Sequence, residues 1–151
     1  MLDRAIFLAS DGTAPPLPEY SEPVHEGSGR TRPRVLVVDD EQLIAQTVAA
    51  ILNANGFEAQ EAYSGEEALA AAHRFQPDIV LTDVLMPRMT GVELGIRLRK
   101  ELPATRVLLF SGQAATSELM QRAESEGHRF TLFPKPIHPE ELIARLRGLE
   151  E

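Results

Sequence analysis

The 151-residue sequence contains no cysteine, and it has no long hydrophobic run. Without cysteine the chain forms no disulfide, holds no thiolate-bound metal and has no cysteine nucleophile. Its apolar runs are far shorter than the roughly 20 residues of a membrane-spanning helix. The first ten residues, with acidic Asp3 and a short apolar stretch, lack the pattern of a secretory signal peptide. We therefore expect a cytoplasmic protein without a membrane partner.

Basic side chains are also scarce. The chain has 15 Lys and Arg against 23 Asp and Glu, which gives a formal net charge of −8 and a pI near 5.0. Nucleic acids and anionic membranes are bound by clustered Lys and Arg, so neither is expected as the main partner. The hydrophobic content of 43% is enough for one globular domain with a core.

Composition divides the chain near Arg34. Residues 1–33 contain five prolines and few aliphatic side chains, and such a segment buries too little surface to offset its ordering entropy. We expect a flexible Pro/Gly-rich tail over residues 1–33 and a folded domain over residues 34–151.

From Arg34 onward, strand-like and helix-like patterns alternate with short connections. The apolar runs "RVLVVD", "DIVLTD" and "RVLLFSG" are typical of strands buried on both faces, whereas "FEAQEA" alternates weakly and indicates an edge strand. Strands are expected at 34–39, 57–62, 78–83, 106–112 and 130–133, with helices at 41–55, 64–76, 90–101, 116–126 and from 139 onward.

Five βα units predict an α/β fold with a doubly wound, five-stranded parallel sheet and five helices in a three-layer sandwich. We expect the flavodoxin-like strand order 2-1-3-4-5, in which ligands bind beyond the carboxyl ends of the strands.

Polar groups follow four of these strands at that same edge. They are Asp39, Asp40, Asp83, Ser111 and Lys135. Each has a simpler interpretation when taken alone, because an Asp pair after a strand often caps a helix, and a serine or lysine in a loop is often just solvated. Their joint position at one edge favours a functional site.

Three neighbouring carboxylates repel one another unless a counter-charge is present. Oxygen ligands with room for water and a phosphoryl oxygen suit Mg²⁺ better than zinc or copper. Three carboxylates, one Mg²⁺ and one Lys have a formal charge of zero. In this setting Asp83 is a candidate nucleophile toward phosphorus, with the metal, the Lys135 ammonium and the Ser111 hydroxyl on the equatorial oxygens of the transition state.

The motifs "VVDDE", "DVLMPRMTG", "LLFSG" and "PKPIHPEEL", in this order and spacing, resemble the receiver domain of two-component response regulators of the stand-alone type. The resemblance covers about residues 34–149. It implies that a sensor histidine kinase or a histidine phosphotransfer protein donates a phosphoryl group, and that the chain is a phosphoacceptor with self-catalysed phosphotransfer and autodephosphorylation rather than a metabolic enzyme.

The resemblance also implies individual roles. Asp83 would be the acceptor, Ser111 would hydrogen-bond the phosphoryl group, and Lys135 would pair with one of its oxygens. The peptide bond from Lys135 to Pro136 would be cis, as is frequent in this family.

For the metal, the resemblance implies that Asp40 and Asp83 bind Mg²⁺ directly and that Asp39 acts largely through water. The backbone carbonyl of Leu85 would complete the protein ligands. Pro87 and Gly91 would shape the loop that carries this carbonyl.

One position departs from the family pattern. Receivers usually have Tyr or Phe three residues before the active-site lysine, and here that residue is Leu132. Aromatic switching is therefore not predicted. Signalling is expected through protein contacts of the segment from about Ala114 to Arg147, and a homodimer stays an open alternative.

Two other functions share part of this pattern. A haloacid-dehalogenase-like phosphatase also uses an Asp nucleophile, Mg²⁺ and Lys, but it needs a second Asp where this chain has Leu85. A phosphate-independent interaction module would not require the acidic set together with Lys135.

The chain also allows a prediction about the lifetime of the phosphorylated state. Leu85, two residues beyond the acceptor, has no polar group to orient an attacking water, although Gln113 could supply one. We expect slow autodephosphorylation. Following the decay of the phosphorylated protein tests this, and loss within seconds would contradict it.

Overall fold

The computed structural model describes residues 31–112 and 116–149, except for the side chain of Thr116. The expected flexible tail therefore lies outside the described residues over 1–30, as does Gln113. Ten elements alternate along the chain: β1 (Arg34–Val38), α1 (Gln42–Asn53), β2 (Glu58–Ala62), α2 (Gly65–Phe75), β3 (Ile79–Asp83), α3 (Gly91–Glu101), β4 (Arg106–Ser111), α4 (Thr116–Ser125), β5 (Thr131–Pro134) and α5 (Pro139–Gly148).

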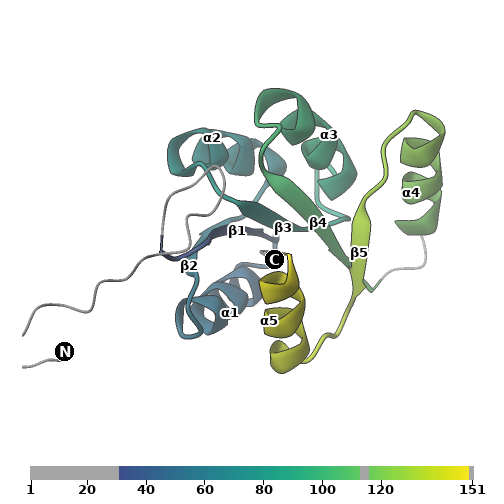
Figure 1. Ribbon diagram of the computed structural model, residues 1–151. Coiled ribbons are helices and arrows are strands. Elements are labelled where there is room, and N and C mark those ends of the chain that lie inside the picture. The colour runs from purple at the N-terminus through teal and green to yellow at the C-terminus, as the bar shows by residue number, and fades with distance from the viewer. Residues whose placement is uncertain (1–30, 113–115, 150–151) are drawn as a thin grey trace, which may run out of the picture. The chain divides into compact units, whose positions relative to one another are not determined.

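The five strands form one parallel sheet in the order β2-β1-β3-β4-β5 (Figure 1). In its register, Val38 of β1 lies beside Ala62 of β2 and Thr82 of β3. The predicted fold class and strand order are confirmed. The weakly alternating strand β2 lies at an edge, as its sequence indicated.

Helices cover both faces of the sheet, with α2, α3 and α4 on one side and α1 and α5 on the other (Figure 1). Successive strand residues point to opposite faces, so each strand contributes to two cores. Leu36 and Val80 are fully buried on the α2–α3 side. Val35 and Leu81 are fully buried on the α1–α5 side. Burial on both faces explains the continuous apolar runs of the central strands.

Local signals fix where the helices begin. Thr90 and Glu93 form a complete capping box at the start of α3, as their spacing predicted. At α2 the box is only half formed: Ser64 accepts from the Glu67 amide at 3.0 Å, but the Glu67 carboxylate accepts from the amide of Tyr63 instead. Helix α5 begins at Pro139, as expected.

Most elements differ from the prediction by one or two residues at one or both ends, and α1 and β5 are examples. Helix α1 spans Gln42–Asn53, shorter at both ends than the expected 41–55, since Glu41 is its N-cap and Ala54 its C-cap. Strand β5 spans Thr131–Pro134, one residue later than expected. The amide of Lys135 donates to the Ser111 carbonyl at 2.9 Å, which extends the pairing of β4 and β5 toward Pro134.

The loop between β3 and α3 folds back tightly on the end of β3. The amide of Gly91 donates to the Val84 carbonyl at 2.7 Å. A Cβ atom at Gly91 would lie 2.1 Å from the carbonyl oxygen of Asp83, far closer than van der Waals contact allows. Only glycine lets the backbone pass this close to the last residue of β3.

We therefore expect Gly91→Ala to destabilise the fold by about 2 kcal/mol or more, because the clash is with backbone and cannot be relieved by a side-chain rotation. Urea denaturation measures the free energy of unfolding. Gly148→Ala is the matched control, since a Cβ there meets nothing within 4 Å. Equal stability of the two variants would contradict the close approach at Gly91.

Candidate functional site

The carboxyl ends of the central strands bring the predicted polar residues to one edge of the sheet. Asp39 and Asp40 directly follow β1, and Asp83 is the last residue of β3. Ser111 ends β4, and Lys135 comes directly after β5. The register places Phe110, the residue before Ser111, beside Asp83.

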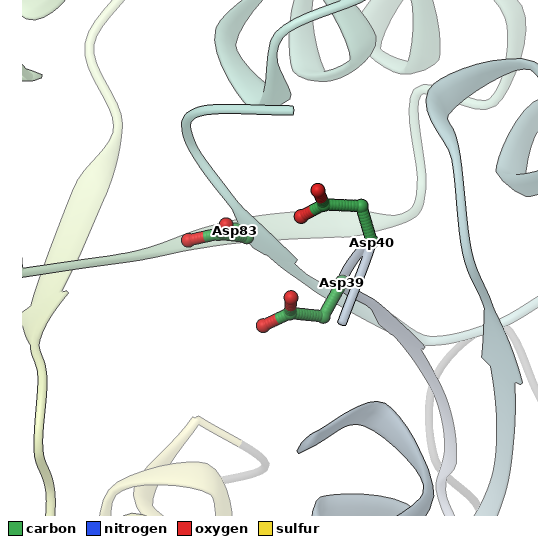
Figure 2. Close-up of side chains that lie close together, drawn as sticks. All are labelled: Asp39, Asp40 and Asp83. Carbon is green, nitrogen blue, oxygen red and sulfur yellow. The ribbon is translucent and has the colours of Figure 1, made fainter. Parts of the chain in front are cut away.

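The three carboxylates converge. One oxygen from each of Asp39, Asp40 and Asp83 can be chosen so that all lie within 4.8 Å of one another. Figure 2 shows the three side chains gathered at the ends of β1 and β3. Their environments differ, because Asp39 is buried, Asp83 is half-buried and Asp40 is exposed.

A single ammonium group lies between two of these carboxylates. Lys135 Nζ is 3.1 Å from Asp39 Oδ2 and 3.1 Å from Asp83 Oδ1. The same Nζ lies 5.8 Å from the centroid of the Phe110 ring, at the outer range of a cation–π contact. Lys135 therefore joins strands β1, β3 and β5 across the edge of the sheet.

Burial and repulsion act on Asp83 more strongly than this ion pair. Burial raises the pKa of Asp83 above its ordinary value of 3.8; Lys135 opposes the rise, while the charges of Asp39 and Asp40 add to it. For Lys135, burial lowers the pKa, but hydrogen bonds and charge from Asp39 and Asp83 outweigh it and raise the pKa overall. The site therefore favours a bound cation, and it disfavours the state in which all three carboxylates are ionised.

Hydrogen bonds from backbone and side-chain donors hold the acidic residues in place. The amide of Glu41 donates to Asp39 Oδ1 at 2.9 Å, so both oxygens of Asp39 have protein partners. The fully buried Thr82 hydroxyl donates to the Asp83 carbonyl at 2.9 Å. These contacts fix the backbone on both sides of the acidic cluster.

Ser111 and Leu85 also lie at this edge. Ser111 is buried, and its carbonyl accepts from the Lys135 amide. Leu85 lies two residues beyond β3, with its side chain against the α2–α3 core. Within the described part of the chain, no hydrogen bond reaches the Leu85 carbonyl. The predicted cis peptide bond from Lys135 to Pro136 is present.

Two contributors to the site were missed in the sequence. Phe110 places its ring near Lys135, and it packs edge-on against Phe133 with ring centroids 6.2 Å apart. Thr82 binds the Asp83 carbonyl. Both are adjacent to predicted site residues, but an aromatic or a β-branched residue in a buried strand is ordinary, so neither gives a distinct signal.

Comparison with known proteins decides the family. Residues 35–147 match the family described as response regulator receiver domain. The chain belongs to this family. The resemblance to a receiver domain and the function class drawn from the sequence motifs are confirmed.

Curated relatives support the same family. The protein named "Probable transcriptional regulatory protein TcrX" from Mycobacterium tuberculosis is 37% identical over 115 residues, which cover 76% of this chain and 48% of that protein. "Response regulator MprA" of Mycolicibacterium vanbaalenii is 34% identical, over 77% of this chain and 49% of that protein. The chain thus spans about half the length of the curated relatives it matches.

Among solved structures, the chemotaxis response regulator CheY4 of Vibrio cholerae has a TM-score of 0.68 and 33% identity, over 79% of this chain and 99% of that chain. This chain is a receiver domain of two-component response regulators. Receiver domains bind Mg²⁺ through acidic residues and interact with histidine kinases, and this one has the acidic cluster. The phosphatase and the phosphate-independent module are not favoured.

None of the described helices is both long and apolar enough to cross a membrane.

The electrostatics of this receiver give a prediction about stability. Because the pKa of Asp83 is raised in the folded state, the folded protein holds that proton more tightly than the unfolded chain does. The free energy of unfolding therefore falls as pH rises from the ordinary value through the raised one. In the absence of divalent cations, Asp83→Asn should stabilise the protein at pH 7 by roughly 1 kcal/mol, and the gain should shrink in acid.

Urea denaturation in EDTA at several pH values measures this gain. Glu118→Gln removes the same charge from an exposed position on α4 and serves as the control. A gain of equal size in both variants would mean that net charge is responsible. Destabilisation by Asp83→Asn would mean that the ion pair with Lys135 outweighs burial and repulsion.

Proposed function

We propose that Asp83 is the phosphoacceptor of this receiver and takes a phosphoryl group from a phosphohistidine of a sensor histidine kinase or a histidine phosphotransfer protein. The observation that carries the proposal is the position of Lys135 Nζ, 3.1 Å from carboxylate oxygens of both Asp39 and Asp83. A cation held there lies beside the nucleophile and can pair with an oxygen of the incoming phosphoryl group.

The transfer exchanges one bond for another. A carboxylate oxygen of Asp83 forms the bond to phosphorus while the N–P bond of phosphohistidine breaks, and the imidazole leaves with the electron pair and takes up a proton. Little covalent work falls to the protein, so rate depends on position and charge. Lys135 balances charge on one equatorial oxygen, and the Ser111 hydroxyl donates to another.

The donor set fits Mg²⁺. Both oxygens of Asp39 already accept hydrogen bonds, from Glu41 and Lys135, which supports an indirect role for Asp39 through water. Asp40 is exposed, Asp83 has a second oxygen, and the Leu85 carbonyl lies in the adjoining loop. Hard oxygen donors with room for water match this ion. When bound, Mg²⁺ neutralises charge on the phosphoryl oxygens and relieves the repulsion between the carboxylates.

Output is proposed to pass through the face formed by α4, β5 and α5, roughly residues 114–147, of which 114–115 lie outside the described residues. Leu132 on β5 is 39% exposed, one of two large hydrophobic side chains found exposed among the described residues. Phe133 is buried against Phe110, and Phe130 packs toward α3. We propose that Leu132 contributes apolar contact to a downstream protein or a second copy in the cytoplasm, without an aromatic switch.

The direct test is incubation with acetyl phosphate and Mg²⁺. Intact-mass measurement should show the gain of one phosphoryl group, the adduct should be cleaved by hydroxylamine, and Asp83→Asn should abolish it. EDTA should prevent its formation. Steady release of phosphate without an adduct would support a phosphatase, and absence of any adduct on the wild-type protein would overturn the proposal.

Lysine offers a matched pair of variants, because the sequence has only Lys100 and Lys135. Lys135→Ala should slow phosphorylation by about tenfold to a hundredfold, since one charge on the transition state is lost. Lys100→Ala, an exposed residue at the end of α3, should leave the rate unchanged. Similar rates for both variants would remove Lys135 from the mechanism.

A further inference from the structure

A groove of about 540 Å³ lies at the edge of the sheet opposite the phosphoacceptor site. The groove is lined by the first residues of β4 and β5 and by the loops before these strands. The end of α3 and the residue after α5 complete it. Its lining includes Arg99, Pro103, Arg106, Arg129, Phe130 and Leu149.

Three arginines line this groove in a protein whose net charge is −8. Arg129 Nε lies 3.9 Å from Oε2 of Glu124, and both side chains are largely exposed. Such an exposed ion pair contributes little to stability. In the described part of the chain, neither Arg99 nor Arg106 forms an ion pair. The groove therefore holds an excess of positive charge that an anion would neutralise.

Arg99 is held in place by two contacts. Its guanidinium stacks 3.9 Å from the centroid of the Phe130 ring, and it donates a hydrogen bond to the Arg129 carbonyl. A guanidinium already fixed by its neighbours loses less conformational entropy when it binds a ligand. This is the feature that separates the groove from a set of freely moving surface arginines.

The same contacts restrict the class of anion. One face of Phe130 is covered by Arg99, and its edge meets Gly95, where a Cβ atom would lie 2.7 Å from the ring. The face that Arg99 covers is thus not available for stacking a nucleotide base. Pro103 and Leu149 add apolar surface beside the guanidinium groups. Carboxylates separated by short apolar side chains match this arrangement.

We propose that the groove binds an acidic, extended peptide segment of a partner protein, whose carboxylates pair with the guanidinium groups of Arg99, Arg106 and Arg129. The charge complementarity and the fixed Arg99 carry this assignment. The groove lies at the amino ends of β4 and β5, whereas Ser111 and Lys135 lie at their carboxyl ends. Binding here is independent of the proposed phosphorylation.

Fluorescence anisotropy with a labelled peptide of alternating Glu and Leu, at about 0.15 M ionic strength, tests the proposal on the full chain. The double variant Arg106→Gln/Arg129→Gln should weaken binding by about tenfold or more, because two exposed counter-charges are lost. Arg122→Gln, on the exposed side of α4 and outside the groove, should change affinity less than about threefold. Asp83→Asn should bind as the wild type does, so failure of the proposed function would not affect the result.

Amide chemical shifts should place the peptide at Arg106, Thr131 and Leu149. Equal loss in the Arg122 variant would overturn the proposal in favour of general charge attraction. Displacement of the peptide by lower concentrations of pyrophosphate or of a single-stranded oligonucleotide would assign the groove to phosphate instead. A manyfold rise in affinity on changing Glu150 and Glu151 to Gln would assign it to the chain's own acidic end.

Discussion

The structure depends on one ammonium group placed between two carboxylates. Lys135 Nζ is 3.1 Å from both Asp39 and Asp83, and these residues follow different strands. Three ionised carboxylates and one ammonium leave a net charge of −2 at this edge, which the +2 charge of the proposed Mg²⁺ would balance. The protein alone therefore leaves the site incompletely neutralised. That imbalance is what makes the site responsive, because any event that alters its charge also alters the interactions that join β1, β3 and β5.

Backbone geometry keeps these side chains close together at the carboxyl ends of the strands. The parallel sheet directs the carboxyl ends of all its strands to one edge, and the order β2-β1-β3-β4-β5 places β3 between β1 and β4. The loop after β3 could still vary, but Gly91 binds the Val84 carbonyl and packs against the Asp83 carbonyl, while Thr90 and Glu93 start α3 immediately beside it. Thr82 holds the same carbonyl from the interior. Asp83, the proposed acceptor, thus lies on backbone that is fixed from three directions.

The sequence predicted the fold class, the strand order and the residues that meet at the functional edge, because apolar runs, capping signals and strand-end polar residues are all local patterns. It predicted Asp39, Asp83 and Lys135 as neighbours from topology alone. It did not predict that Lys135 would bridge Asp39 and Asp83, that Asp39 would have both oxygens occupied, or that Phe110 would underlie the ammonium. Such features depend on side-chain orientation across strands, which the spacing of residues along one chain does not encode. The half-formed capping box at Ser64 has the same origin, since the Glu67 carboxylate accepts from the amide of Tyr63 rather than from that of Ser64.

The acidic site and the arginine groove lie at opposite ends of the strands and differ in charge. Acidic side chains lie at the carboxyl ends of β1 and β3. Arginine side chains lie at the amino end of β4 and in the loop before β5, although they do not form a cluster in the sequence. Arg99, Arg106 and Arg129 are spread over 31 positions, and only the packing of α3 beside β4 and β5 brings them together. Composition alone argued against nucleic acid or an anionic membrane as the main partner, since the net charge is −8. That inference holds for long phosphate backbones, which need extended basic tracts. It does not extend to a small groove, where the three guanidinium groups are proposed to bind a short acidic segment.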